Sequence, residues 1–193
     1  MNWYCDYLPP EQLVVDASVL INILGCGAPE TILRGLQHPA LVEERTLREV
    51  LRHPLPGQDH TTFFDFAFKS RLLSKVEMCD AEYDTYLGLI QASLGTRLDD
   101  GESAALSVAS HRRICAVIDE KKARNFAARY FPDLKVVSSL KLLISAAARL
   151  NKGSSWAKTT IANAHAHARL AAPKEERQLL SGILANTGGN IER

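Results

Sequence analysis

The sequence has few cysteines, and they are scattered along the chain. Cys5, Cys26, Cys79 and Cys115 lie far apart, and no two of them form a CxxC pair. This spacing indicates neither a zinc site nor a redox-active pair. Cys115 stands in an apolar run and is predicted to be a small buried side chain. A reducing, cytoplasmic location is the expectation that follows from this cysteine usage.

Long apolar runs are missing as well. No stretch approaches the ~18–20 residues that a membrane-spanning helix needs, so we expect no membrane association. Residues 1–12 lack a basic start followed by an apolar core, and no secretory signal is predicted there. Aromatic residues make up only 7% of the chain, and no stacking platform for nucleic-acid bases can be recognised among them.

The chain also lacks a strong net charge. The formal value of +1 argues neither for nor against a nucleic-acid partner. Residues 1–140 hold 15 basic and 19 acidic side chains, whereas residues 141–193 hold 8 and 3. This distribution is compatible with a tail that contacts a polyanion. The 193 residues are 46% hydrophobic and 23% charged, which is typical of one globular domain, with or without an appendage.

Short β-branched runs alternate with amphipathic runs from residue 13 to about residue 140. Alternation at this spacing predicts a parallel sheet covered by helices on both faces. The expected strands lie near residues 13–15, 40–42, 72–78, 114–119 and 134–139. The expected helices lie at 18–24, after Pro29, after Thr46, at 59–72, 80–94, from 101 and at 120–131.

Cap and stop residues set the expected helix ends. Thr46, Asp80 and Asp100 are predicted to be N-caps, and Gly95 is predicted to end the helix that begins at Asp80. From residue 141 onward the pattern is helical only, with a break at Pro173 and a frayed end at residues 188–193.

Four acids fall where parallel strands end or where helices leave the same edge of the sheet. Asp16 and Asp119 follow the runs LVV and CAVI, while Glu49 and Glu102 stand in or near the first turns of helices. Ligands of open parallel sheets bind outside the carboxyl ends of the strands. Three of the acids also have a simpler interpretation. Asp119 could cap a helix, Glu102 could be stabilised in the first turn by the helix dipole, and Glu49 could lie on a solvated helix face. Asp16 is the hardest to dismiss, because apolar residues flank it on both sides.

A cluster of partly buried carboxylates is unfavourable without a compensating charge. The groups would repel one another and resist ionisation. Mg²⁺ or Mn²⁺ removes both penalties, because hard divalent cations prefer carboxylate oxygens and keep waters, one of which can become a nucleophile.

The motifs around these acids resemble those of PIN-domain ribonucleases, in particular the VapC-like toxins of prokaryotic toxin–antitoxin pairs. The resemblance rests on VVDASVLINIL, the Glu of TLREVL, LDDGESAALSVA and AVIDEKKARNFA, in the order of the family. It implies a three-layer α/β/α fold with a mainly parallel sheet. The implied division is a lead-in at residues 1–12, a catalytic domain at 13–140 and a C-terminal helical extension at 141–193.

The resemblance also implies roles for individual residues. The catalytic and metal-binding acids would be Asp16, Glu49, Glu102 and Asp119, with Mg²⁺ or Mn²⁺ as the cofactor. Ser18 would position a carboxylate or a water, and Glu120 would extend the acidic cluster. Asp99 and Asp100 are spare acids, Asp100 being the expected cap of the helix that contains Glu102. Lys121, Lys122 and Arg124 could contact the substrate backbone, although a solvated helix face is the stronger interpretation for each of them taken alone.

The predicted function is metal-dependent hydrolysis of RNA phosphodiester bonds, as in the toxin of a toxin–antitoxin pair, with an antitoxin protein and a homodimer among the implied partners. The alternative is a catalytically silent domain that binds nucleic acid or acts as a scaffold. Receiver domains need two adjacent acids after the first strand, and haloacid-dehalogenase-type phosphatases need an acid at position 18; neither pattern is present. His165 and His167 lie two residues apart on a predicted helix, so they face different ways and are read as surface residues rather than metal ligands.

Overall fold

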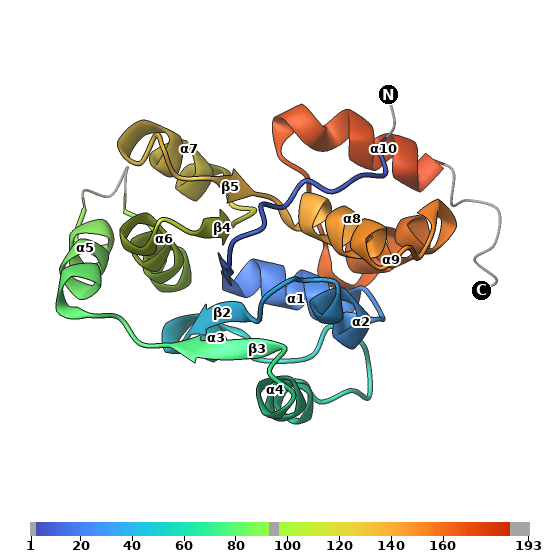
Figure 1. Ribbon diagram of the computed structural model, residues 1–193, viewed down its shortest axis with the longest axis horizontal. Helices are drawn as coiled ribbons and strands as arrows, with labels where there is room; N and C mark the ends of the chain where they lie inside the picture. Colours follow the sequence, from blue (N-terminus) through green and yellow to red (C-terminus); the bar gives the residue numbers. More distant parts are fainter. Residues whose placement is uncertain (1–2, 93–96, 186–193) are drawn as a thin grey trace.

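A five-stranded parallel sheet forms the centre of the computed structural model, which describes residues 3–92 and 97–185 (Figure 1). The strand order is β3-β2-β1-β4-β5, and every neighbouring pair is parallel. The strands are β1 (Leu13–Val15), β2 (Ala40–Glu43), β3 (Leu73–Val76), β4 (Cys115–Val117) and β5 (Val136–Val137). The predicted three-layer α/β/α class, with its parallel sheet, is confirmed.

Helices connect the strands and cover both faces of the sheet. They are α1 (Ala17–Gly25), α2 (Pro29–Arg34), α3 (Glu44–Glu49), α4 (His60–Lys69), α5 (Asp80–Ile90), α6 (Asp100–Arg112), α7 (Lys121–Tyr130), α8 (Ser139–Arg149), α9 (Ser154–Ala168), the 3₁₀ turn η1 (Lys174–Glu176) and α10 (Arg177–Ala185). Figure 1 shows α5, α6 and α7 on one side of the sheet and α1, α2 and α8 on the other.

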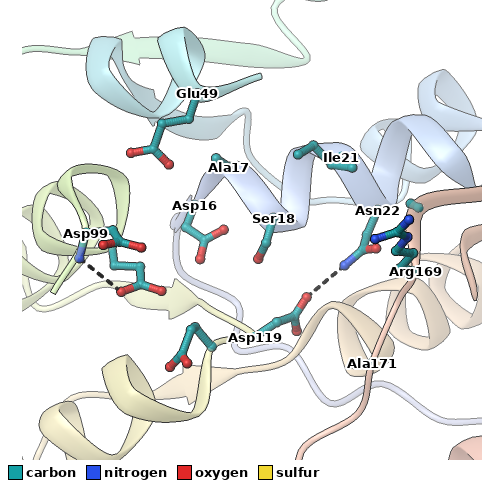
Figure 2. A pocket seen from close by; sticks show the side chains of 13 residues that line it. Asp16, Ala17, Ser18, Ile21, Asn22, Glu49, Asp99, Asp119, Arg169 and Ala171 are labelled. Carbon is teal, nitrogen blue, oxygen red and sulfur yellow. Dashed lines mark hydrogen bonds between the residues drawn. The ribbon is translucent and has the colours of Figure 1, made fainter. Parts of the chain in front are cut away.

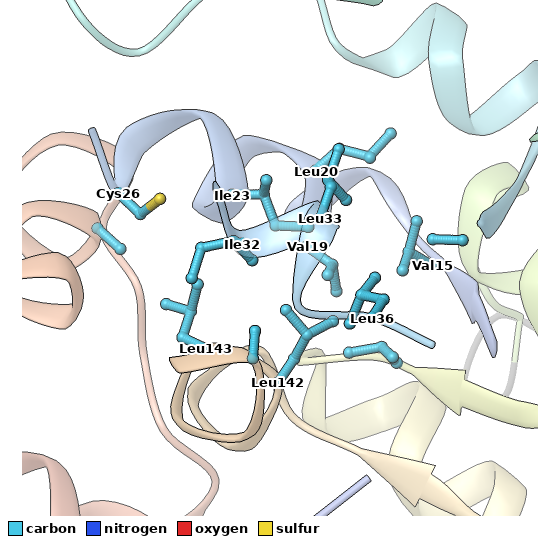
Figure 3. Close-up of a cluster of buried hydrophobic side chains, with 14 of the residues drawn as sticks. Val15, Val19, Leu20, Ile23, Cys26, Ile32, Leu33, Leu36, Leu142 and Leu143 are labelled. Atoms are coloured by element: carbon cyan, nitrogen blue, oxygen red, sulfur yellow. The ribbon is translucent and has the colours of Figure 1, made fainter. Parts of the chain in front are cut away.

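The alternation of side chains along each strand supplies one apolar core to each face. On β1, Leu13 and Val15 face the larger core, formed with α1, α2, α8 and α9, while Val14 faces the smaller core against α6 and α7. Figure 3 shows the larger core, where Val19 and Ile23 of α1 lie among Ile32, Leu33 and the leucines of α8. Strands that are buried on both faces appear in the sequence as continuous apolar runs, which is why they could be predicted.

The strand order reverses beside β1. The chain runs from β1 to β2 and β3 on one side, and then returns to add β4 and β5 on the other side. The switch point therefore lies between β1 and β4, where the connections diverge and leave a crevice at the carboxyl edge. Asp16 directly follows β1 and Asp119 lies two residues beyond β4, so both acids stand at this crevice.

Three predicted N-caps are wrong. Glu43 rather than Thr46 caps α3, because its carboxylate accepts a hydrogen bond from Arg45 N at 2.6 Å. Thr46 is buried within that helix.

The caps of α5 and α6 each lie one residue earlier than predicted. Cys79 rather than Asp80 caps α5, and Asp99 rather than Asp100 caps α6. In both helices a Glu at the third position accepts a hydrogen bond from the N-cap amide, which fixes the earlier start. The predicted stop at Gly95 and the predicted frayed end at 188–193 lie outside the described residues.

The helices after β5 pack on the α1 side of the sheet. Ile161, Leu170 and Ile183 are buried in the larger core. Gly25 at the end of α1 lies against Ala168 at the end of α9, where a β-carbon on residue 25 would stand 2.5 Å from the Ala168 side chain. None of the helices in the described ranges is long and apolar enough to cross a membrane.

Candidate active site

The carboxyl edge of the sheet opens into an acidic cavity of about 470 Å³. Its acidic lining residues are Asp16, Glu49, Asp99, Glu102, Asp119 and Glu120. Figure 2 shows Asp16 and Ser18 at the start of α1, Asp119 below them and Glu49 on the opposite wall. The four acids singled out in the sequence thus lie around one cavity, although they come from four separate segments of the chain.

Asp16 is buried at the start of α1. Its side chain is the N-cap of the helix, with Oδ1 accepting a hydrogen bond from Val19 N at 3.2 Å. Only 3% of the residue is exposed. Burial, together with the charge of Asp119, raises the pKa of Asp16 to about 7, although the Ser18 hydroxyl and nearby amides offset part of the effect.

Asp119 is fixed by two side chains and an amide. Ser139 N donates to Oδ1 at 2.8 Å, while Ser139 Oγ at 2.5 Å and Asn22 Nδ2 at 2.8 Å donate to Oδ2. Burial raises the pKa of Asp119, and these hydrogen bonds and the charge of Arg124 oppose the rise. The carboxylate therefore makes its contacts with α1 and α8 and contributes no cap to α7.

Glu49 contacts the start of α6, the helix that carries Glu102. Gly101 N donates to Glu49 Oε1 at 2.7 Å. Burial raises the pKa of Glu49, and this hydrogen bond counters it. Burial first, and then the charges of Asp16 and Glu120, raise the pKa of Glu102 to about 7. Gly101 allows the close approach, because a β-carbon there would stand 2.8 Å from Glu49 Oε2.

Glu120, Lys122 and Arg124 make contacts within the chain, while Lys121 is exposed at the start of α7. Glu120 is the N-cap of α7, accepting hydrogen bonds from Lys122 N and from Ala123 N. Lys122 Nζ donates to the carbonyl of Arg97. Arg124 donates to the carbonyl of Ile118 at 3.2 Å and pairs with Glu175 at 3.1 Å. The cap role considered for Asp119 thus belongs to Glu120.

Several lining residues were not recognised in the sequence. Asn22 lies one turn after Ser18 on the same face of α1 and lines the cavity. Ser139, which donates to Asp119, lies two residues beyond β5, just as Asp119 lies two residues beyond β4. The positions of both residues relative to the predicted strands and helices could have identified them in the sequence. Ala168, Arg169 and Ala171 reach the cavity from the C-terminal helices, and no local pattern links them to the acids.

The side chains at the cavity are of the kind that binds a hard divalent cation, but their oxygens do not surround one common point. Among the described residues, no three Asp, Glu, His or Cys side chains are close enough together to hold a metal ion. Two buried oxygens at the cavity, Ser18 Oγ and Asn22 Oδ1, lack a hydrogen bond of ordinary geometry. Such buried oxygens are costly unless a ligand or a water satisfies them. Carboxylate, hydroxyl and amide oxygens are the ligands that Mg²⁺, Mn²⁺ and Ca²⁺ prefer.

Comparison with known proteins identifies the family. No curated protein and no solved structure matches the chain significantly. A family model described as a PIN domain matches residues 12–174, which include α8 and α9 as well as the sheet. PIN domains are generally nucleases and commonly use divalent metal ions. Because the match covers most of the chain, and because a parallel sheet gathers the acids at its switch point, this chain belongs to the PIN-domain family.

Proposed function

We propose that the protein is a metal-dependent endoribonuclease whose site is formed by Asp16, Glu49, Glu102 and Asp119. The observation that supports it is the gathering of these four carboxylates, from separate segments of the chain, around one cavity. Burial and neighbouring carboxylates raise the pKa of Asp16 and of Glu102 there to about 7. Folding gains nothing from burying mutually repelling acids, so a ligand that requires them is the simplest reason for their position.

A bound Mg²⁺ or Mn²⁺ ion would activate a water for attack on the phosphodiester and neutralise charge on the phosphoryl oxygens. The protein supplies a stiff set of oxygen donors. The helix start fixes Asp16, Ser139 and Asn22 fix Asp119, and the Gly101 amide orients Glu49. The buried oxygens Ser18 Oγ and Asn22 Oδ1 at the cavity can each accept a hydrogen bond from an ordered water.

The alternative function is a PIN-like domain that binds nucleic acid without cutting it. The observation that favours it is the lack of convergence, since within the described part of the chain no three possible ligands already surround one point. Metal binding tests the site, and cleavage then separates the two functions.

The finer assignments are also proposals. A toxin of a toxin–antitoxin pair, held inactive by an antitoxin protein, is the form of the enzyme that the sequence resemblance implies. A homodimer, RNA as the nucleic acid cut and a cytoplasmic location belong to the same proposal. The match to a PIN-domain model supports a nucleic-acid substrate but does not distinguish RNA from DNA.

Calorimetric titration of Mn²⁺ into the purified chain tests the metal site. We expect one or two ions to bind, with affinity at least tenfold weaker in the Asp16→Asn and Glu102→Gln variants, because each loses a charged ligand. Glu30→Gln is the control, since Glu30 lies on α2 in an exposed pair with Arg34. Wild-type affinity in both site variants would contradict the assignment.

A further inference from the structure

A second hollow of about 670 Å³ continues the acidic cavity. The two share four lining residues, namely Ile21, Glu49, Ala168 and Arg169. The remaining walls of the second hollow come from the segment between α3 and α4 and from His167. We call this hollow the side groove. A molecule bound across the acidic cavity can therefore continue into the side groove past Glu49 and Arg169.

Both walls of the side groove are held in place by the fold. On one wall, Pro54 precedes a turn at residues 55–58. Pro56 and Gly57, with a φ of +73° at Gly57, are the central residues of that turn. On the other wall, Leu170 is 1% exposed and its amide bonds the Ala164 carbonyl at 3.2 Å. This anchor holds Arg169 in the left-handed conformation at the end of α9.

The side groove is lined by cationic and hydrogen-bond-donating groups. Arg52 and Arg169 line it, and within residues 3–92 and 97–185 no ion pair engages either guanidinium. His53 Nδ1 accepts the Leu55 amide at 3.1 Å, so its Nε2 carries the proton and can donate. His167 lies beside Arg169. By contrast, Lys122 and Arg124 on α7 already contact groups of the chain itself.

We propose that the side groove binds the sugar–phosphate backbone of single-stranded RNA next to the phosphodiester that is cut. The inference rests on the proposed function and extends it to the path of the substrate. The acidic cavity repels every phosphate that a bound cation does not neutralise. The flanking phosphates therefore need separate cations. The guanidiniums of Arg52 and Arg169, which no ion pair engages in the described part of the chain, supply them in geometry suited to phosphate oxygens. Leu51, 82% exposed at the same groove, offers an apolar contact to a base.

The salt dependence of RNA binding tests this proposal. The probe is a fluorescein-labelled single-stranded RNA of mixed sequence in Ca²⁺ buffer, with its integrity checked on a gel, and the readout is fluorescence anisotropy from 50 to 200 mM salt. Removing one phosphate contact to a single strand should reduce the slope of log affinity against log salt by about 0.7. We expect this for Arg52→Ala and for Arg169→Ala, each with about tenfold weaker affinity.

Arg113→Ala is the matched control. Arg113 also follows a helix in the left-handed conformation, with a φ of 54° against 59° for Arg169. It precedes β4 and so lies at the amino edge of the sheet. The Arg52→Lys and Arg169→Lys variants keep the charge and should keep the wild-type slope, so they separate loss of a phosphate contact from misfolding.

The outcomes separate the groove from the metal site. Slopes and affinities equal to those of Arg113→Ala overturn the groove, whether or not the wild-type protein cuts RNA. Wild-type protein that binds no RNA overturns the groove together with the nuclease proposal, and Mn²⁺ titration of the same sample then shows whether the metal site stands. Reduced slopes in both alanine variants, restored by lysine, support the groove even if no cleavage is found.

Discussion

Asp16 carries a destabilising charge in the absence of a cation. Its pKa is about 7 in the folded protein against 3.8 for an ordinary aspartate. Between these values the folded state binds more protons than the unfolded state, so the free energy of unfolding falls as pH rises from about 4 to about 7. Glu102, whose pKa is also about 7, adds to the same loss. A divalent cation reverses this dependence, because it binds the deprotonated carboxylates.

The Asp16→Asn variant should therefore be more stable than the wild type and inactive. The amide keeps an oxygen for the Val19 amide but carries no charge. In EDTA at pH 8 we expect a gain of roughly 1–3 kcal/mol in the free energy of unfolding, measured by urea denaturation. Nuclease activity should be almost completely lost while the fold is retained.

The control for this variant is Asp65→Asn, which removes an exposed acid on α4. Repeating both measurements at pH 4.5 should abolish most of the gain, because Asp16 is then protonated in the folded wild type. Full nuclease activity in Asp16→Asn would remove Asp16 from the site.

Gly101 is predicted to support metal binding, because it leaves space for the Glu49 carboxylate. A β-carbon in Gly101→Ala would lie 2.8 Å from Glu49 Oε2 and displace that carboxylate. The end of a flexible side chain moves easily, so the unfolding free energy should change by less than about 1 kcal/mol. Mn²⁺ affinity, measured by calorimetry, should fall about tenfold. Gly88→Ala on α5, where no atom would contact the new methyl group, should leave the affinity unchanged.

At the scale of elements, α7 depends on Glu120 for its start. Glu120 accepts hydrogen bonds from two first-turn amides. Replacing it with alanine should lower the free energy of unfolding by about 1 kcal/mol, the usual value of a lost N-cap. Mn²⁺ affinity should change less than threefold, because Glu120 is engaged by the helix. A tenfold loss of affinity would instead show that Glu120 extends the acidic cluster, as the sequence resemblance implies.

The elements themselves could be predicted because their cores impose simple patterns. The run CAVI is buried on both faces of the sheet, and the apolar residues of α1 all enter one core. Helix starts were harder to predict, since adjacent acids compete for the cap. The pairs Asp99–Asp100 and Asp119–Glu120 offer two candidates each. The local contact of Glu102 selects Asp99 as the cap of α6, whereas the tertiary contacts of Asp119 leave the cap of α7 to Glu120.

At the scale of the molecule, the parallel topology explains why dispersed acids could be grouped from the sequence. All strands point the same way, so residues that follow them reach one edge. The contribution of the C-terminal helices could not be predicted in this way. Arg169 reaches the cavity because Ala168 fits against Gly25 and Leu170 is buried, and these contacts join segments far apart in the sequence.

Deleting residues from 153 onward should prevent folding rather than release a separate domain. The deletion removes Ile161, Leu170 and Ile183 from the core, each worth about 1.5–3 kcal/mol of burial. It also leaves Ser138 and Lys141 without Glu176. The sum approaches the whole stability of a typical domain. Circular dichroism and size exclusion should show an unfolded or aggregated product.

A chain ending at Ala185 keeps all of these contacts and is the control. A cooperatively melting product from the shorter chain would contradict the dependence on α9 and α10. It would support the division expected from the sequence, with a catalytic domain that ends near residue 140 and a separate C-terminal extension.

Cleavage of a mixed pool of structured and unstructured RNAs tests the central claim most directly. The purified wild-type chain is incubated with the pool in Mn²⁺ and, separately, in EDTA. The Asp119→Asn variant is incubated with the same pool in Mn²⁺. We predict cutting by the wild type in Mn²⁺ alone, because the carboxylates act through a bound cation. Cutting that persists in EDTA, or in the variant, would contradict the four-carboxylate site. Mn²⁺ binding without cutting of any RNA would favour the silent nucleic-acid-binding domain.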